Sequence, residues 1–291
     1  MIPGSFEYHT PSSISDAVAL LQQYGEEAKI LSGGHSLVPM MKLRIAEPEH
    51  IVDINGIAGL DYIKEEGGVL KIGALVRESD LEHSDLIASK FPIIADAAKL
   101  IADPLVRNRA TVAGNLAHGD PANDHPAVML ALGAEVVLTG GSGERVVPIS
   151  EFFVDLLETA LKPDEILTEV RIPMPPANSG GAYFKIERRV GDFAIIAVAA
   201  QVTLDASGNC ASAGIGLTNS GPTPIKVTAA EAYLAGKALD DATLAEAGNL
   251  AEAASDPTSD TRAPAEYKKA MVKQMTIRAL RRAAERAKGG N

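Results

Sequence analysis

The stretch "LSGGHSLVPMMKLR" (31–44) places two glycines, a histidine and a serine directly after a short apolar run. A second stretch rich in small residues, "TVAGNLAHGD" (111–120), follows about 80 residues later. We name residues 31–37 glycine motif 1 and residues 111–115 glycine motif 2. Glycine is a poor former of strands and helices, so its presence in both motifs must be explained by the backbone geometry there.

Two such motifs could form a phosphate site if they face one another. Glycine permits a positive φ and lets a ligand approach the backbone without a Cβ in the way. Successive N–H groups of a loop then point into one concavity that favours an anion, and each hydrogen bond to a charged group contributes roughly 1.5–3 kcal/mol. A pyrophosphate held in this way needs no Lys or Arg. The alternative is a pair of tight turns without a ligand, because glycine is common in turns.

The usual nucleotide-binding motifs do not occur in the sequence. It contains no GxxxxGK[ST], and "GIGLTN" (214–219) has Asn219 where a GxGxxG motif has its third glycine. A bound dinucleotide is therefore not expected on a Rossmann unit.

The composition limits the classes of function. The 291 residues suffice for two domains, or for one domain with a smaller appendage. The single cysteine, Cys210, excludes an intrachain disulfide, a cysteine-based zinc site and an iron–sulfur cluster. The formal net charge of −11 argues against nucleic acid as a main partner, but not against an anionic cofactor held by backbone N–H groups.

We expect a cytoplasmic chain. The apolar run "AIIAVAA" (194–200) is far shorter than a membrane span of ~20 residues. The first residues, "MIPGSFEYH", have neither the basic region nor the apolar segment of a signal peptide.

The N-terminal third predicts a small α/β unit. Ser13 or Ser15 can cap a helix that Gly25 ends. Two short apolar segments, 28–31 and 50–54, are typical of buried strands.

Residues 56–176 have a different pattern, in which short strands alternate with glycine-rich turns and predict antiparallel hairpins. Two helices are expected there, over 84–102 and 125–133. The segment "IPMPPANSGG" (172–181) is the best domain boundary, because it is rich in proline and glycine.

Three strand-like segments follow, and the last seventy residues predict three helices. The strands cover 182–189, 193–205 and 210–219, and the short turn "ASGN" (206–209) between the second and the third predicts a hairpin or meander. The last helix, 264–288, is basic in an acidic chain. It could contact a membrane or a partner subunit, but we favour a helix packed on its own domain through an apolar side that includes Met271, Met275 and Ile277.

The two glycine motifs together resemble those of the FAD-binding medium subunits of molybdenum hydroxylases. The resemblance extends through "TVAGNLAHGDPANDHPAV" (111–128) and covers nearly the whole chain, including "MIPGSFEYH" (1–9), "GLTN" (216–219) and "SDTRAPAEYKKAM" (259–271). It implies an α+β fold with a vanillyl-alcohol-oxidase (PCMH)-type FAD-binding domain over 1–176, divided into α/β subdomains of about 1–55 and 56–176. A C-terminal domain of antiparallel sheet and helices would span 177–291.

The resemblance also implies where non-covalent FAD binds. The pyrophosphate would lie between motif 1 (Leu31, Ser32, Gly33, Gly34, His35, Ser36, Leu37) and motif 2 (Thr111, Val112, Ala113, Gly114, Asn115). Ala113 stands where many relatives have a glycine. Further cofactor contacts would come from Ile101 and Ala102, and from Asp124 near the ribityl group. Leu167 would lie against the flavin ring and Lys185 near the pyrimidine edge of that ring. Asp192 and Phe193 would lie beside the isoalloxazine. Phe193 in place of tyrosine removes a hydroxyl from that position.

Several of these residues could instead have a purely structural role. A cation at Lys185 would favour flavin reduction, and this role is favoured over the alternative of a strand-edge lysine that faces water. Asp124 could accept ribityl hydroxyls or loop N–H groups, and it could also cap helix 125–133. His118, Asp120, Asp124 and His125 fit no metal-binding pattern, so a polar turn is favoured and no metal site is predicted.

The function implied by the resemblance is electron transfer, with no catalytic residue on this chain. Electrons would come from a small [2Fe–2S] subunit and pass to an external acceptor, a quinone or the respiratory chain. Molybdopterin would lie on a large partner subunit, and the complex would be a dimer of heterotrimers with possible contact to the inner face of the membrane. Carbon monoxide is the favoured substrate, with aldehydes, purines or N-heterocycles as alternatives. A function of another class, a self-contained FAD oxidase, remains open.

Overall fold

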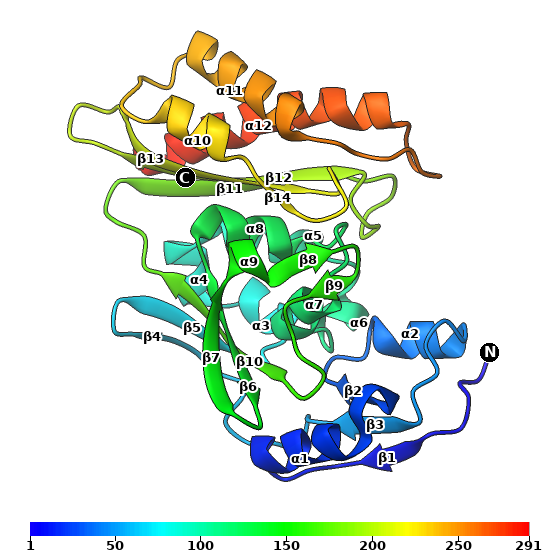
Figure 1. Cartoon of the computed structure of the whole chain (residues 1–291). Coiled ribbons are helices and arrows are strands. Elements are labelled where there is room, and N and C mark those ends of the chain that lie inside the picture. Colours follow the sequence, from blue (N-terminus) through cyan, green and yellow to red (C-terminus); the bar gives the residue numbers. More distant parts are fainter. Residues whose placement is uncertain (291) are drawn as a thin grey trace.

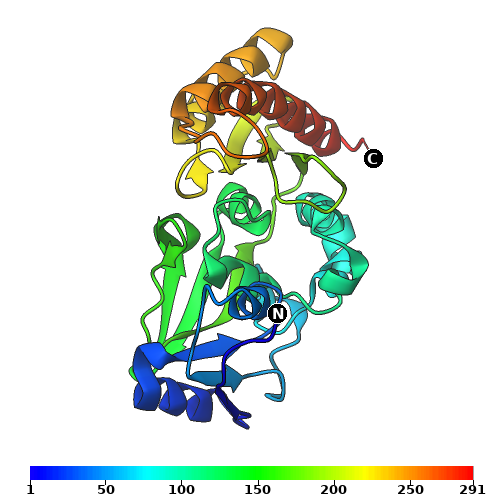
Figure 2. The same ribbon diagram turned by 90° about the vertical axis from the view of Figure 1, so that its right-hand side faces the viewer.

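The computed structural model describes residues 1–290 and shows three units stacked along the molecule (Figure 1). The N-terminal unit lies at one end and the C-terminal unit at the other, with the largest sheet between them. The turned view in Figure 2 shows the same order. The observed mixture of separate helices and mainly antiparallel sheets confirms the α+β class.

The N-terminal unit is a three-stranded parallel sheet in the order β1-β3-β2, covered by α1. Ser13 caps α1, and Gly25 ends it with a φ of 55°, so the predicted helix and both predicted strands are confirmed. The elements are β1 (Glu7–His9), α1 (Ile14–Tyr24), the 3₁₀ turn η1 (Gly25–Glu27), β2 (Ala28–Leu31), α2 (Leu37–Lys42) and β3 (His50–Asp53).

The middle unit contains the expected antiparallel hairpins in one five-stranded sheet of order β4-β5-β10-β6-β7. Its strands are β4 (Ile63–Glu66), β5 (Val69–Gly73), β6 (Glu135–Gly140), β7 (Gly143–Pro148) and β10 (Ile166–Pro173), with the small hairpin β8 (Phe153–Asp155) and β9 (Glu158–Thr159). Its helices are α3 (Glu78–Glu82), α4 (Asp85–Lys90), α5 (Pro92–Leu100), α6 (Pro104–Arg107), α7 (Val112–His118), α8 (His125–Leu132) and α9 (Ile149–Phe152).

The single helix predicted over 84–102 is wrong, because the chain forms α4 and α5 with a break at Phe91. Phe91 has φ −132° and ψ 61°, outside the helical region. Pro92 follows and disfavours the helical conformation of the residue before it, while its own fixed φ suits the first position of α5.

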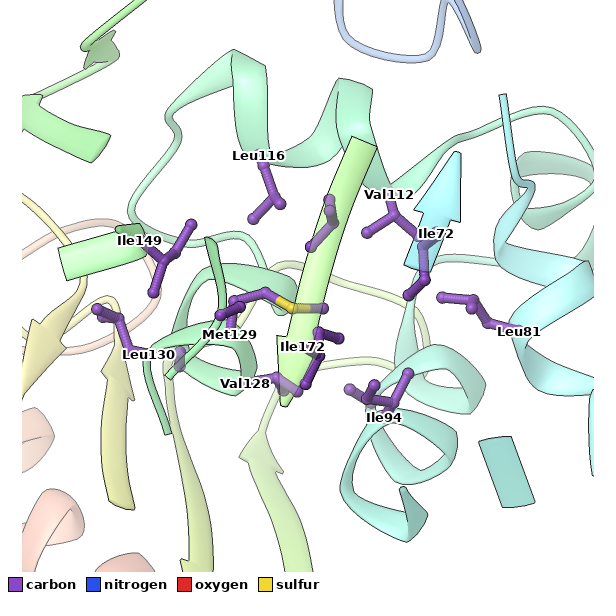
Figure 3. Close-up of a cluster of buried hydrophobic side chains, with 14 of the residues drawn as sticks. Ile72, Leu81, Ile94, Val112, Leu116, Val128, Met129, Leu130, Ile149 and Ile172 are labelled. Atoms are coloured by element: carbon purple, nitrogen blue, oxygen red, sulfur yellow. The ribbon is translucent and has the colours of Figure 1, made fainter. Parts of the chain in front are cut away.

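The main hydrophobic core fills the space between this sheet and its helices. Val112 and Leu116 point from α7 into the core, where Val112 lies beside Ile72 of β5 (Figure 3). Both side chains are fully buried, so α7 has a fixed position on the sheet.

The C-terminal unit is a four-stranded antiparallel meander in the order β11-β12-β13-β14, with helices packed on one face. Its elements are β11 (Ser179–Ile186), β12 (Ile196–Leu204), β13 (Cys210–Thr218), β14 (Ile225–Lys226), α10 (Thr228–Leu234), α11 (Asp241–Ala254) and α12 (Ala265–Ala287). The expected meander and three helices are confirmed. Met275 is buried, and Met271 and Ile277 pack against the same core, so the apolar side of α12 is covered by its own unit.

Two glycines of "GIGLTN" determine how the middle and C-terminal units come together. A Cβ on Gly214 would lie 1.9 Å from the carbonyl oxygen of Ala131, and one on Gly216 would lie 2.0 Å from that of Ala127. Both alanines belong to α8, which therefore packs directly on the backbone of β13. These glycines serve helix–sheet packing.

Candidate functional site

Glycine motif 1 is the loop between β2 and α2, as expected. Gly34 has a φ of 78°, a conformation that favours glycine. Gly33 makes a close approach instead, because a Cβ there would lie 2.6 Å from the carbonyl oxygen of Arg109 and 2.7 Å from Cα of Ala110. Motif 1 therefore lies directly against the chain that enters motif 2.

Glycine motif 2 is the start of a helix, so the expectation of a second loop is wrong. Thr111 caps α7, and its Oγ1 accepts a hydrogen bond from the N–H of Gly114 at 3.1 Å. A Cβ on Gly114 would lie 2.8 Å from that Oγ1. The glycine thus leaves room for the cap, a role that the short sequence pattern did not reveal.

A cavity of about 630 Å³ lies between the two motifs. Its volume is within the ~300–1,000 Å³ range of small-molecule sites. It is lined by residues 31–37 of motif 1, by Thr111, Gly114 and Asn115 of motif 2, and by Lys29, His118, Thr159 and Lys162 among others. The structure therefore brings the two predicted motifs together around one space.

Unused hydrogen-bonding groups line this cavity. Over the described part of the chain, the backbone N–H groups of residues 33–36 donate to no protein acceptor. The side-chain oxygen Oδ1 of Asn115 is buried and also has no partner. Buried polar atoms are normally paired. The free N–H groups fit an anionic group of a ligand, and the unpaired amide oxygen, which can only accept, fits a hydroxyl or another donor on the same ligand.

Three predicted residues face the protein core. Val112 and Ala113 are buried on the inner side of α7, and they do not line the cavity. Leu167 lies in β10 at a register shift opposite β6, and it is 4% exposed within the main core.

Asp124 and Lys185 form a buried ion pair. Nζ of Lys185 lies 3.1 Å from Oδ2 of Asp124 and donates to the carbonyl of Leu100 at 3.0 Å. The hydroxyl of Tyr183 donates to the other carboxylate oxygen. Burial raises the pKa of Asp124, although the Lys185 ammonium and the Tyr183 hydroxyl act in the opposite direction. Burial and the Asp124 carboxylate together raise the pKa of Tyr183 well above its usual value.

This geometry contradicts two alternatives from the sequence, a water-facing Lys185 and a side-chain cap by Asp124. The Lys185 side chain is 1% exposed, so a lysine facing water at a strand edge is wrong. Asp124 makes no side-chain cap on α8, because both of its oxygens are engaged by Tyr183 and Lys185. The ion pair is nevertheless linked to the cavity, since Asn123 donates to the carbonyl of Asn115 at 2.8 Å.

The turn that carries Asp192 and Phe193 lies beside Ile101 and Ala102. A Cβ on Gly191 would lie 2.5 Å from the carbonyl oxygen of Ala102, which itself has a φ of 46°. Asp192 pairs with Arg262 at 2.9 Å, and Arg262 lies over the ring of Phe193. Phe193 is 47% exposed, so this turn offers an aromatic face at the surface.

Two of the polar residues after α7, Asp120 and His125, have partners within the protein. Oδ1 of Asp120 accepts from the N–H of Ala122, which is typical of a polar turn. Nε2 of His125 lies 2.6 Å from Oε2 of Glu78, and both side chains are fully buried. Sequence reasoning missed this pair, because the two residues are 47 positions apart and no local pattern relates them.

Comparison with known proteins identifies the family. Residues 4–175 match the model described as FAD binding domain in molybdopterin dehydrogenase, and residues 181–283 match CO dehydrogenase flavoprotein C-terminal domain. The chain belongs to the FAD-binding subunits of molybdenum hydroxylases. The predicted resemblance is confirmed, and the chain is an FAD-dependent oxidoreductase subunit.

Three relatives of this family illustrate the similarity. The carbon monoxide dehydrogenase medium chain of Afipia carboxidovorans is 49% identical and covers 99% of this chain and 100% of its own length. The 6-hydroxypseudooxynicotine dehydrogenase complex subunit alpha of Paenarthrobacter nicotinovorans is 38% identical. The alignment covers 99% of this chain and 97% of the relative. A structure of carbon monoxide dehydrogenase from Hydrogenophaga pseudoflava aligns with a TM-score of 0.96 and 48% sequence identity. The alignment covers 98% of this chain and 99% of the chain in that structure.

Among the helices formed by residues 1–290, none combines the length and the apolar character needed to cross a bilayer.

Proposed function

We propose that the cavity between the glycine motifs binds the pyrophosphate of FAD without a covalent bond. The N–H groups of residues 33–36 would donate to the phosphate oxygens, and Asn115 would contact a hydroxyl group of the cofactor. The two motifs line one cavity, their N–H groups are free, and Asn115 has an unpaired oxygen. These three observations support the assignment.

We place the flavin ring toward the second group of predicted residues. Ile101 and Ala102 lie beside the turn of Asp192 and Phe193, whose exposed ring offers an apolar contact. Asp124, Leu167 and Lys185 are enclosed in the protein. They would act from behind this surface, with the Lys185 charge favouring a reduced, anionic flavin.

We propose that the chain is the electron-transfer subunit of an aerobic carbon monoxide dehydrogenase. Bound FAD supplies a redox centre that exchanges electrons with other groups. The chain would receive electrons from a small [2Fe–2S] subunit and deliver them to a quinone or the respiratory chain, while a large subunit holds the molybdenum cofactor. The single observation that carries this proposal is 49% identity to a medium chain of that enzyme over 99% of the sequence.

The assembly and its location are part of the same proposal. The relatives are named as a medium chain and as a complex subunit. We therefore propose a heterohexamer, a dimer of heterotrimers, in the cytoplasm, with peripheral contact to the inner face of the membrane. The alternative is a flavin subunit of a hydroxylase that acts on another substrate. A relative with 38% identity is named for such an activity, 6-hydroxypseudooxynicotine dehydrogenase, and this supports the alternative. Family membership disfavours a self-contained oxidase.

Purification of the native protein tests this function. We expect three chain types to elute together, and acid precipitation to release all of the yellow chromophore to the supernatant. A single chain type would contradict the assembly, and flavin that stays in the pellet would contradict non-covalent binding.

A further inference from the structure

Two histidines of the N-terminal sheet, His9 and His50, lie side by side, and neither lines the cavity between the glycine motifs. β1 and β3 pair in parallel, with Glu7 opposite His50 (Figure 1). Since side chains alternate along a strand, Glu7 and His9 lie on the same face of the sheet as His50. Three groups that can bind metals therefore meet on one face, although His9 and His50 are 41 positions apart.

The distances between these groups suit one metal ion. Nε2 of His9 lies 3.1 Å from Nδ1 of His50, and Oε2 of Glu7 lies 3.7 Å from the same Nδ1. In a tetrahedral zinc site with Zn–N bonds of 2.0–2.1 Å, two ligand nitrogens are about 3.3–3.4 Å apart. A small separation of the imidazoles would therefore admit the ion.

The two imidazoles are held in place by Tyr24 at the end of α1. Its ring stacks on His50 with centroids 3.6 Å apart, and it lies 5.2 Å from the ring of His9. The His50 side chain is 13% exposed, whereas that of Glu7 is 72% exposed. The nitrogen donors are thus preorganised, and the carboxylate can close over an ion that enters from solvent.

The charge around the pair also favours a cation. Glu27 and Glu49 form a second group with His50 in which the possible ligand atoms lie within 4.8 Å of one another. Three carboxylates, those of Glu7, Glu27 and Glu49, therefore lie around the His50 imidazole. Nitrogen and carboxylate oxygen are ligands that zinc and similar transition metals accept, and a carboxylate can also orient a bound imidazole.

We propose that Glu7, His9 and His50 form a binding site for a divalent transition-metal ion such as Zn²⁺, with a water molecule in the fourth position. The ion would join β1 to β3 and stabilise the N-terminal sheet that supports glycine motif 1. The simpler alternative is a hydrogen-bonded histidine pair that has no affinity for metal.

Calorimetric titration of the tag-free, metal-stripped full chain with ZnCl₂ tests the proposal. We expect one ion per chain, and a loss of affinity of at least tenfold in Glu7→Gln and in His9→Asn. His83→Asn is the matched control, because His83 is exposed and its ring forms a hydrogen bond with the carbonyl of Ser79 in the neighbouring turn. Co²⁺ should give the strong visible bands of a tetrahedral site in the native chain and in the control.

The outcomes distinguish a metal site from a histidine pair without metal. Glu7 is exposed, so Glu7→Gln should fold even if His9→Asn does not, and its melting temperature without metal should equal that of the native chain. Stoichiometric binding that both site variants weaken and the control retains supports the metal site. No saturable binding, or binding that Glu7→Gln leaves unchanged, would overturn it.

Discussion

The hydroxyl of Ser32 lies 3.0 Å from the hydroxyl of Thr111, and this contact joins the two glycine motifs across 79 residues of sequence. Thr111 also caps α7, whose apolar side is fixed in the main core. Motif 1 is therefore attached to a helix whose apolar side is buried in the main core. Its position relative to motif 2 sets the width of the cavity.

The variant Gly33→Ala should lose both stability and FAD. The added Cβ would meet the backbone of Arg109 and Ala110 at less than 3 Å, which forces the motifs apart. We expect a loss of about 1–3 kcal/mol in the free energy of unfolding, together with reduced flavin content. Gly56→Ala is the control, since a Cβ there meets nothing within 4 Å. Native stability of Gly33→Ala in urea unfolding would contradict the close packing.

The variant Asn115→Ala should separate cofactor binding from stability. Its Oδ1 has no partner within the described chain, so its removal should change the melting temperature by less than about 2 °C. One lost hydrogen bond to a bound group should weaken FAD binding about tenfold. Asn249→Ala, on the exposed face of α11, provides the comparison. Unchanged FAD affinity in a fluorescence titration would remove Asn115 from the site.

The variant Lys185→Met should strongly destabilise the protein, because it leaves the carboxylate of Asp124 buried without its cation. Breaking one side of a buried pair costs about 3–5 kcal/mol, whereas replacing both charges costs much less. We expect the double variant Asp124→Asn with Lys185→Met to recover most of the stability in urea unfolding. If the single and the double variant lose the same free energy of unfolding, the unpaired charge of Asp124 is not the cause of the destabilisation.

The lowered pKa of Asp260 should make the stability of the protein depend on pH in the acidic range. Burial alone would raise its pKa, but the ammonium of Lys268 and the N–H groups of Ala263 and Arg262 lower it to about 2. A lowered pKa in the folded state stabilises the protein above the unfolded value of 3.8, and this contribution is lost as the pH falls from about 4 to about 2. Since the Asp260 side chain is 33% exposed, we expect about 1–2 kcal/mol.

Asp260→Asn tests this effect through urea unfolding at several pH values between 2 and 6. The variant should show a weaker loss of stability below pH 4 than the native chain. Asp256→Asn, a nearby acidic position with no ion pair among residues 1–290, should leave the native profile unchanged. Identical acid profiles for Asp260→Asn and the native chain would contradict the pairing with Lys268.

The sequence predicted most elements because their signals are local. Ser13 and Gly25 mark both ends of α1, and the glycine-rich turns correctly indicate the hairpins of the middle sheet. The pairing of the two glycine motifs was found through resemblance, since no local rule relates positions 33 and 111. The break at Phe91 was missed, although Pro92 is a local signal for it.

Long-range contacts account for what the sequence did not reveal. The burial of Lys185 depends on Asp124 and on the carbonyl of Leu100, which the fold brings together from distant positions. The Glu78–His125 pair and the cluster around His9 and His50 arise in the same way. None of these contacts has a spacing that a motif search could recognise.

The division of labour between this chain and its partners is the central claim. A [2Fe–2S] cluster needs four protein ligands, usually cysteines, and the sequence has one cysteine. The purified chain, loaded with FAD, should be assayed with carbon monoxide and a dye acceptor, first alone and then with the large and small subunits added. We predict no carbon monoxide-dependent dye reduction by the chain alone and clear turnover once all three chains are present. Turnover by the isolated chain would contradict the account.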